Sequence, residues 1–306
     1  MNDLSVNLAG VRLGNPVVTA SGCFGSGKEM SRFVDLQRLG AVVCKTVTLK
    51  PRLGIDPPRG AETPSGMLNA IGLQNPGVDA FVRNDLAWLA DRNVKAIASI
   101  GGQSVEEYVA CAEALNGAPA LVAMELNLSC PNLEDRGFMF ALSAERTAEV
   151  TRAVKEVASV PILPKLSPDV TNIVEIADAA AGAGADGLAL INTTLGMAID
   201  TVTFKPKLST ATGGLSGPAI KPIAVRCVFQ VARALPHLPL IGMGGVRTGD
   251  DALELILAGA TAVAVGTATF IDPHATEHVI QRLEEILRER NIASIDQLRG
   301  QVKIEG

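Results

Sequence analysis

Short runs of Val, Ile, Leu and Ala recur along the chain, and longer amphipathic segments separate them. Most of these runs are apolar throughout instead of alternating between apolar and polar positions, which is typical of strands buried on both faces. The eight runs are Val17–Ala20, Ala41–Lys45, Ala96–Ile100, Val122–Leu126, Ile162–Lys165, Gly187–Ile191, Leu240–Met243 and Ala262–Val265. The alternation predicts βα units that close into a (β/α)8 TIM barrel, an α/β fold.

The amphipathic segments between the runs predict the outer wall of helices. Ser104, Ser143 and Thr171 stand at the start of three of them and are natural N-caps. The helices are expected at Glu29–Leu39, Asp79–Asp91, Val105–Leu115, Ala144–Ala158, Asn172–Ala183, Pro218–Leu235, Asp250–Leu257 and Pro273–Arg288.

Two further segments add to the barrel. Val6–Leu8 and Val11–Leu13 flank Ala9-Gly10, a pattern that predicts a β-hairpin closing the barrel floor. Thr46–Gly77 is rich in Pro and Gly and has no helical pattern, so we expect a long functional loop. No linker divides the 306 residues, and we therefore expect one domain over residues 1–306.

Composition narrows the possible partners. The 27 basic and 32 acidic residues give a net charge of -5, which argues against nucleic acid. The five cysteines are scattered, with no pattern of a disulfide framework or a metal site, as expected for a reducing cytoplasm. The chain starts without the pattern of a signal peptide, and the uncharged stretch Leu255–Ile271 is short for a membrane span and contains two glycines. We expect a cytoplasmic protein that binds neither nucleic acid nor membranes.

Polar residues and glycines follow the predicted strands, at the end of a TIM barrel where active sites lie. They are Ser21, Lys45, Thr46, Asn127, Lys165, Asn192, Thr193, Gly244, Gly245, Gly266 and Thr267. The glycine turns after strands seven and eight predict a phosphate site, although two ordinary turns remain the alternative. No G-x-G-x-x-G follows a strand, so a mononucleotide fits better than a dinucleotide. If it is FMN, Lys165 could stabilise the reduced flavin; otherwise Lys165 belongs to a core ion pair.

The hexapeptide Asn127–Asn132 places the thiol of Cys130 between two carboxamides, directly after a buried run. Cys130 could act as a base or nucleophile, and Asn127 and Asn132 could hold a planar ligand rich in amides. The alternative is that Asn and Pro only build a turn after the strand. The three histidines are predicted at the barrel floor or in the last helix, away from these residues.

These features together resemble class 1 of the dihydroorotate dehydrogenase family over essentially the whole chain. The motifs that carry the resemblance are Lys45–Thr48 with Pro51-Arg52, Asn69–Asn75, Asn127–Asn132, Lys165–Pro168, Ile191–Thr193, Gly214–Gly217 and Gly242–Val246. The resemblance implies an FMN-holding barrel that oxidises (S)-dihydroorotate to orotate in de novo pyrimidine synthesis.

The resemblance also implies roles for the matching residues. Cys130 would be the base that removes the C5 proton while a hydride passes from C6 to flavin N5. The residues implied to bind dihydroorotate are Lys45, Asn69, Asn127, Asn132, Asn192 and Thr193. One FMN would be held by Ala20, Ser21, Lys45, Thr46, Asn127, Lys165, Ile191, Gly217, Gly244, Gly245, Gly266 and Thr267. Glu134–Met139 would be a mobile lid; an ordinary surface loop is the alternative.

Within the family, Gly213–Pro222, Gly22–Gly27 and a cysteine base resemble class 1B. This resemblance implies a second subunit with FAD and a [2Fe-2S] cluster that passes electrons to NAD, and a homodimer of this chain within a heterotetramer. Two places depart from the family pattern, Ile55-Asp56 and Phe138–Ala141, and they bear on lid dynamics and partner preference.

Two other functions remain open from the sequence. One is a flavin oxidoreductase similar to the barrel of dihydropyrimidine dehydrogenase, which shares the Asn-x-Ser-Cys-Pro core. The other is a flavin-free phosphate-binding barrel, an isomerase, lyase or inactive scaffold. The first alternative is distinguished from dihydroorotate dehydrogenase by its reductant, which would be a neutral instead of a carboxylated dihydropyrimidine. The second is distinguished by the visible colour of the protein, since it would lack a flavin.

Overall fold

Eight parallel strands form a barrel in the structure, a computed structural model that describes residues 2–128 and 139–304. The strands follow the order β3-β16-β15-β10-β9-β8-β7-β4, and a parallel bridge between Val18 and Ala41 joins the two ends. Their bounds are β3 Val17–Thr19, β4 Val42–Val43, β7 Ala96–Ile100, β8 Leu121–Asn127, β9 Ile162–Leu166, β10 Leu188–Leu190, β15 Leu240–Met243 and β16 Ala262–Val265. The predicted TIM barrel is confirmed, with three strands matching residue for residue.

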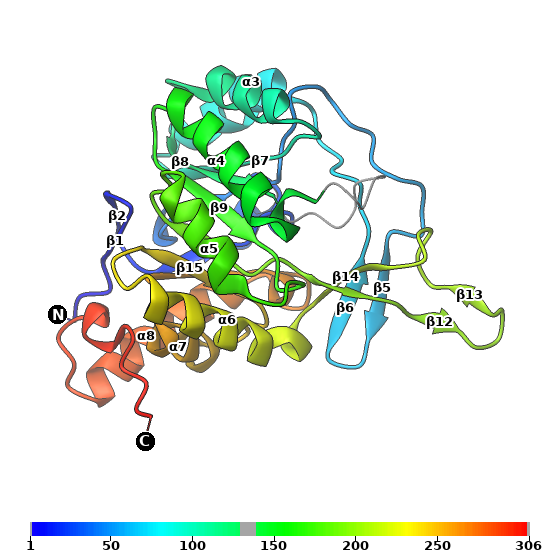
Figure 1. Cartoon of the computed structure of the whole chain (residues 1–306). Coiled ribbons are helices and arrows are strands. Elements are labelled where there is room, and N and C mark those ends of the chain that lie inside the picture. The colour runs from blue at the N-terminus through cyan, green and yellow to red at the C-terminus, as the bar shows by residue number, and fades with distance from the viewer. Residues whose placement is uncertain (1, 129–138, 305–306) are drawn as a thin grey trace.

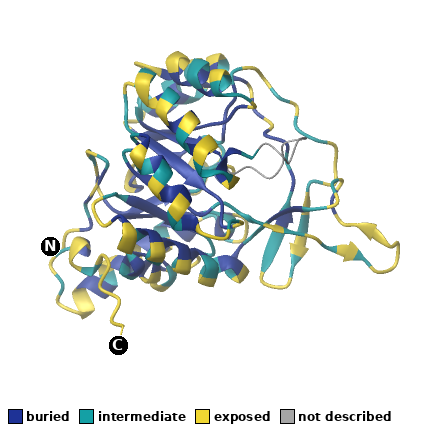
Figure 2. Cartoon of the chain, viewed as in Figure 1, coloured by how far each residue is buried: buried dark blue, intermediate teal, exposed yellow. Residues whose placement is uncertain are grey.

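The strands are buried on both faces, as their apolar runs predict. Every residue of β7, β9, β15 and β16 is buried. Helices lie outside the barrel with their exposed residues turned away from it (Figure 2). A parallel sheet needs this cover, because burial of both faces removes more apolar surface from water than a one-sided sheet does.

The main helices lie close to their predicted positions. They are α3 Val105–Leu115, α4 Ala144–Val157, α5 Ile173–Gly182, α6 Lys221–Ala234, α7 Gly249–Ala258 and α8 Ala275–Glu289. A further helical segment consists of α1 Val78–Ala80, the π-helical turn η3 Phe81–Leu86 and α2 Ala87–Ala90. Short 3-10 turns are η5 Phe140–Leu142, η6 Pro218–Ile220, η7 Thr267–Phe270 and η8 Ile295–Leu298. Within the described ranges, no helix combines the length and apolar character that a membrane span requires.

The caps are confirmed at two helices and wrong at the third. Ser104 and Ser143 accept hydrogen bonds from the backbone N–H groups of Glu107 and Arg146. For α5 the cap is Asn172 instead of the predicted Thr171, and its Oδ1 accepts from the Val174 N–H at 3.2 Å. An Asn side chain accepts such a bond as well as a Thr does.

The predicted helix Glu29–Leu39 is wrong. Two isolated 3-10 turns, η1 Met30–Arg32 and η2 Leu36–Arg38, occupy this segment. Asp35 separates them, because its backbone is extended and its carboxylate accepts a hydrogen bond from the Gln37 N–H at 3.0 Å. A short acidic side chain that bonds to its neighbouring backbone competes with continuous helix.

The N-terminal hairpin is confirmed at the barrel floor. Strands β1 Val6–Leu8 and β2 Val11–Leu13 pair antiparallel, and Leu8 and Leu13 are buried in the core. Lys95, the residue before β7, donates from Nζ to the Arg12 carbonyl at 2.7 Å. The hairpin therefore lies at the end of the barrel where the strands begin.

A second sheet stands beside the barrel, on the side away from the chain termini (Figure 1). It contains β5 Gly60–Thr63, β6 Gly66–Asn69, β11 Thr194–Gly196 and β14 Gly213–Ser216, in the order β11-β14-β6-β5. The small arm β12 Ile199–Asp200 and β13 Lys205–Pro206 extends from it. The predicted loop Thr46–Gly77 thus contains a hairpin, and this hairpin pairs through β6 with a strand from the segment after β10.

Candidate active site

Two adjoining cavities open at the carboxyl ends of the barrel strands. The larger has a volume of about 540 Å³ and the smaller about 240 Å³. Their walls share Ser21, Cys23, Lys165, Asn192 and Thr193, among others. The cavities therefore form one site with two chambers, and the larger falls in the size range of small-molecule and cofactor pockets.

Every predicted site residue in the described part of the chain lines one of the two cavities. The larger is lined by Ala20, Ser21, Lys165, Ile191, Gly217, Gly244, Gly245, Gly266 and Thr267, nine of the residues expected to hold FMN. The smaller is lined by Lys45, Thr46, Asn69, Asn127, Asn192 and Thr193, which include all the described residues expected to bind substrate. Cys130, Asn132 and the predicted lid apart from Met139 lie outside the described residues, and their roles stay predictions.

Glycines form part of the wall of the larger cavity, as an anion site requires. Gly245 has a φ of +77°, and a Cβ there would lie 2.6 Å from the Lys221 Cβ. A Cβ on Gly217, whose φ is +94°, would lie 2.8 Å from the Gly66 Cα. These positions require glycine, and they leave the backbone open to a ligand. Arg247, which the sequence analysis missed, adds a positive charge to this wall.

Lys165 stands between the two cavities and is paired beneath them. Its Nζ lies 2.7 Å from Glu125 Oε1, and the two side chains are only 5% and 0% exposed. A ligand contact and a core ion pair are alternatives for Lys165 on sequence alone, whereas the structure shows the pair and also places Lys165 at both cavity walls. The pair fixes a positive charge at the point where two ligands would meet.

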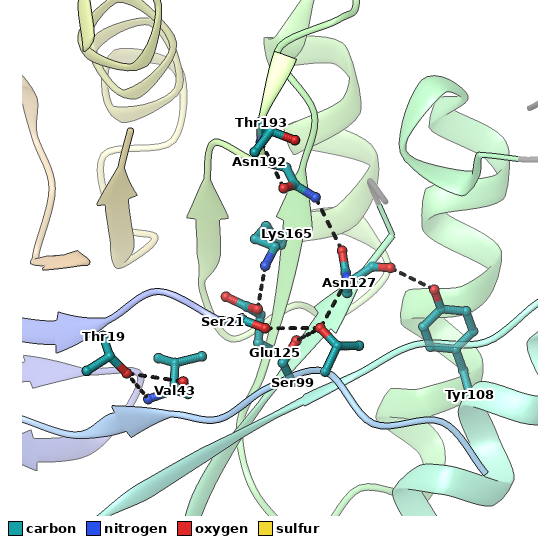
Figure 3. A network of polar contacts seen from close by, with 11 residues as sticks. Thr19, Ser21, Val43, Ser99, Tyr108, Glu125, Asn127, Lys165, Asn192 and Thr193 are labelled. Carbon is teal, nitrogen blue, oxygen red and sulfur yellow. Dashed lines mark hydrogen bonds and ion pairs between the residues drawn. The ribbon is translucent and has the colours of Figure 1, made fainter. Parts of the chain in front are cut away.

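A network of hydroxyl and amide groups holds the smaller cavity in shape (Figure 3). Asn127 donates from Nδ2 to Thr46 Oγ1 at 3.1 Å, and its Oδ1 accepts from Asn192 Nδ2 at 3.3 Å. Thr46 Oγ1 also lies 2.9 Å from Ser99 Oγ and 3.0 Å from Ser21 Oγ. On the other side, the Tyr108 hydroxyl donates to the Asn127 carbonyl at 2.9 Å.

The direction of each hydrogen bond in the network follows from the groups at the ends of the network. The Thr193 N–H donates to Asn192 Oδ1 at 2.8 Å, so Asn192 turns its amide nitrogen toward Asn127, and Asn127 in turn donates to Thr46. A hydroxyl has one hydrogen and two lone pairs, so one serine must donate to Thr46 and the other accept from it. Ser99 is fully buried with Thr46 as its partner, and it is therefore the donor. Thr46 then donates to Ser21, whose own hydrogen is left to point into the cavities.

Cys23 is a thiol at both cavity walls that the sequence analysis did not assign to the site. Burial raises the pKa of Cys23 to about 11, although the positive charges of Lys165 and Lys45 act in the opposite direction. At neutral pH the group is therefore a thiol and a poor base. His274 pairs with Glu277 of α8, and His278 of α8 pairs with Asp272; neither histidine lines a cavity, as expected from their predicted place in the last helix.

Besides Arg247, three residues at or beneath the site were missed because they lie inside strands or short turns. Ser99 is the one polar residue of β7, and Glu125 lies between Met124 and Leu126 in β8; such an exception to the apolar pattern was the available signal. Cys23 follows β3 in a segment without a periodic pattern. Among the residues described, no group of three or more His, Cys, Asp or Glu side chains could hold a metal ion.

The fold and the site define a TIM-barrel protein that has a glycine-lined chamber and an amide-lined chamber side by side at the strand ends. Residues 3–287 match the family model described as dihydroorotate dehydrogenase. The chain belongs to the dihydroorotate dehydrogenase family, and the resemblance drawn from its motifs is confirmed.

Curated relatives and a solved structure agree with this assignment. The dihydroorotate dehydrogenase B (NAD(+)) catalytic subunit of Anoxybacillus flavithermus is 53% identical over 300 residues, which cover 98% of this chain and 96% of the relative. The protein of the same name from Bacillus thuringiensis is 51% identical, with 98% and 97% covered. The crystal structure of DHODH in complex with ferulenol from Eimeria tenella has a TM-score of 0.83 at 23% identity, covers 98% of this chain and 88% of its own, and supports the fold.

Proposed function

We propose that this chain is the FMN-dependent catalytic subunit of a B-type dihydroorotate dehydrogenase, which oxidises (S)-dihydroorotate to orotate in pyrimidine synthesis. The observation that carries the proposal is the pair of adjoining cavities that share Lys165 in a chain of this family. Two ligands placed in these chambers would meet at Lys165, as hydride transfer between a substrate and a flavin requires.

The residues present fit FMN. The backbone of Gly217 and Gly245, where a Cβ would collide with Gly66 and Lys221, lines the larger cavity and suits the phosphate together with Gly244, Gly266 and Thr267. Ala20, Ser21, Ile191 and Lys165 would hold the ring system from the larger cavity, with Lys45, Thr46 and Asn127 reaching it from the smaller one. FMN would supply the hydride acceptor.

The smaller cavity suits a carboxylated dihydropyrimidine. Asn69, Asn127, Asn192 and Thr193 line it with amides and a hydroxyl for the ring amide groups, and Lys45 adds a positive charge for the carboxylate. Asn69 is itself held by a bond from its Nδ2 to the Gly214 carbonyl at 3.2 Å. Asn132 is proposed as a fourth amide on the basis of its motif.

Cys130 is proposed as the base. It follows Asn127, the last residue of β8, by three positions, and Asn127 lines the smaller cavity. The thiolate would take the proton from C5 of dihydroorotate as the C6 hydride leaves, so that the C5–C6 double bond of orotate forms. The segment Glu134–Met139 is proposed as the lid that would exclude water during this step.

The test is an anaerobic spectrum of the purified chain with dihydroorotate or dihydrouracil. Bleaching of a yellow protein by dihydroorotate alone is expected. Bleaching by dihydrouracil alone would favour the dihydropyrimidine dehydrogenase-like alternative, and a colourless chain that cannot be reconstituted with FMN would exclude a flavoenzyme. Cys130→Ser should keep the flavin and slow bleaching by about 10²- to 10⁴-fold. Cys23→Ser, a matched thiol control, should change the rate by less than about tenfold, because the Cys23 thiol is not ionised at neutral pH.

The electrons are proposed to continue to NAD through a second subunit that carries FAD and a [2Fe-2S] cluster, in a cytoplasmic heterotetramer around a homodimer of this chain. The names of the relatives, which contain both NAD(+) and "catalytic subunit", support this proposal. Phe270 and Ile271 line the mouth of the larger cavity and are 59% and 79% exposed. We place the contact with the second subunit over these apolar side chains, where it would approach the flavin.

We also propose that residues 1–306 form one domain. The support is the main buried cluster, which runs from Leu4, ahead of the hairpin, to Ile295 in the last turn. A small second cluster of Leu68, Ala70 and Leu208 adjoins it through Leu215, which packs against both. Limited proteolysis should then release no stable fragment that lacks part of the barrel.

A further inference from the structure

Glu125 is a buried carboxylate that touches neither cavity. It lies in β8 between Met124 and Leu126, and its side chain is 0% exposed. Removing a carboxylate from water is costly unless a partner compensates for it. A neutral residue would fill this place in the barrel at lower cost, so the charge itself calls for an explanation.

The strand register places Glu125 directly below the site. Asn127 pairs with Lys165 between β8 and β9, and Glu125 precedes Asn127 by two residues, so both side chains point to the same face of β8. Lys165 reaches down to Glu125 Oε1 at 2.7 Å while lining both cavities above. The second oxygen, Oε2, has no hydrogen-bond partner among the described residues. Lys165 is therefore the group through which the charge of Glu125 acts.

The geometry points to Glu125 as a positioning residue that tunes how readily the flavin gives up its electrons. This inference rests on the proposed function. Lys165 alone would favour the electron-rich, reduced flavin, and the carboxylate beneath it offsets part of that positive charge. A flavin held too firmly in its reduced form would oxidise dihydroorotate but would pass electrons on slowly. Glu125 keeps Lys165 in place for substrate oxidation, and its negative charge reduces the extent to which Lys165 stabilises the reduced flavin afterwards.

The test is an equilibrium redox titration of the flavin-loaded full chain against a reference dye, without turnover. Glu125→Gln should shift the flavin equilibrium toward the reduced form by about tenfold or more, since it removes one buried negative charge and keeps the shape. Lys165→Met should shift it toward the oxidised form, and the double variant should return toward the wild type. An unchanged equilibrium in Glu125→Gln, or a shift toward the oxidised form, would overturn the inference.

A matched control and a second variant keep the experiment decisive. Asp186→Asn makes the same carboxylate-to-amide change in the surface pair of Lys155 and Asp186, which also lies at 2.7 Å, and should leave the equilibrium unchanged. If Glu125→Gln does not fold, Glu125→Asp withdraws the carboxylate from Lys165 and should give a smaller shift in the same direction. Bleaching of the wild type by dihydroorotate tests the proposed function. The position of the flavin redox equilibrium in each variant relative to the wild type tests the role of Glu125.

Discussion

Thr46→Val is the substitution that most directly tests the hydroxyl network of the smaller cavity. It keeps the shape of the side chain and removes one oxygen, which serves three partners: Ser21, Ser99 and Asn127. The expected result is a large loss of stability for so small a change. The reason is that Ser99 is fully buried and has no access to water, so it cannot replace the lost bond.

The size of the effect follows from what each partner loses. Ser99 is fully buried and would keep a hydroxyl hydrogen without an acceptor, which costs about 1–3 kcal/mol. Asn127 faces the cavity and can turn to water, so its lost bond costs only about 0.5–1.5 kcal/mol. Ser21 can turn to the larger cavity at little cost. We therefore expect the free energy of unfolding to fall by about 1.5–4.5 kcal/mol.

The assay is urea unfolding of the flavin-free chain followed by far-UV circular dichroism, so that ligand binding does not enter the result. Thr151→Val is the matched control: Thr151 is equally buried, but its hydroxyl donates only to the Thr147 carbonyl of its own helix. It should cost about 1 kcal/mol or less. Ser99→Ala added to Thr46→Val should restore part of the loss by removing the unpaired hydroxyl. The reasoning is refuted if Thr46→Val costs no more than Thr151→Val, or if the added Ser99→Ala restores nothing.

Two other predictions concern Cys23 and the mouth of the larger cavity. Because burial raises the pKa of Cys23 to about 11 from an ordinary value of 9.0, alkylation of Cys23 by iodoacetamide should rise about tenfold per pH unit up to that pKa, as read by peptide mass spectrometry. The buried neutral thiol also adds stability below pH 9 that is lost as the pH rises from about 9 to 11; a labelling rate already at its plateau at pH 8 would contradict both statements. Ile271→Asp should lower dihydroorotate-dependent NAD reduction in the presence of the second subunit and leave anaerobic bleaching of the chain alone unchanged, with the distant exposed Val302→Asp as control. Equal NAD reduction by both variants would place the contact elsewhere.

The barrel could be predicted because its signal is local. Each strand is a short apolar run, and burial on both faces leaves little freedom in where it begins and ends, as β7, β15 and β16 show. The helix predicted at Glu29–Leu39 was wrong because a single side chain interrupts a pattern that otherwise looks helical. The Asp35 carboxylate accepts a hydrogen bond from the Gln37 N–H and divides the segment into two short turns. The hairpin of β5 and β6 was missed because its strands are only four residues long and each begins with Gly, and the pairing of β6 with β14 spans about 145 residues of sequence.

The site could be predicted at the strand ends but not one layer below them. Residues such as Asn127 and Lys165 follow from the rule that barrel sites lie at the carboxyl ends of strands. Glu125 and Ser99 act through contacts across neighbouring strands, and these contacts depend on the register, which a single sequence does not reveal. The donor and acceptor roles in the hydroxyl network also need the three-dimensional structure, because they follow from the number of hydrogen-bond partners around Thr46.

The sheet beside the barrel constrains how this protein can change over generations. In most TIM barrels the loops at the strand ends vary independently, which lets one scaffold acquire new specificities by piecemeal insertion and deletion. Here β6 comes from the segment after β4, β14 and β11 come from the segment after β10, and Asn69 opposite Gly214 lies where they pair. A change of length in either segment would unpair the other and displace Asn69. Substrate recognition is therefore inherited as one linked unit, and a new specificity would have to arise by exchanging side chains on a preserved backbone.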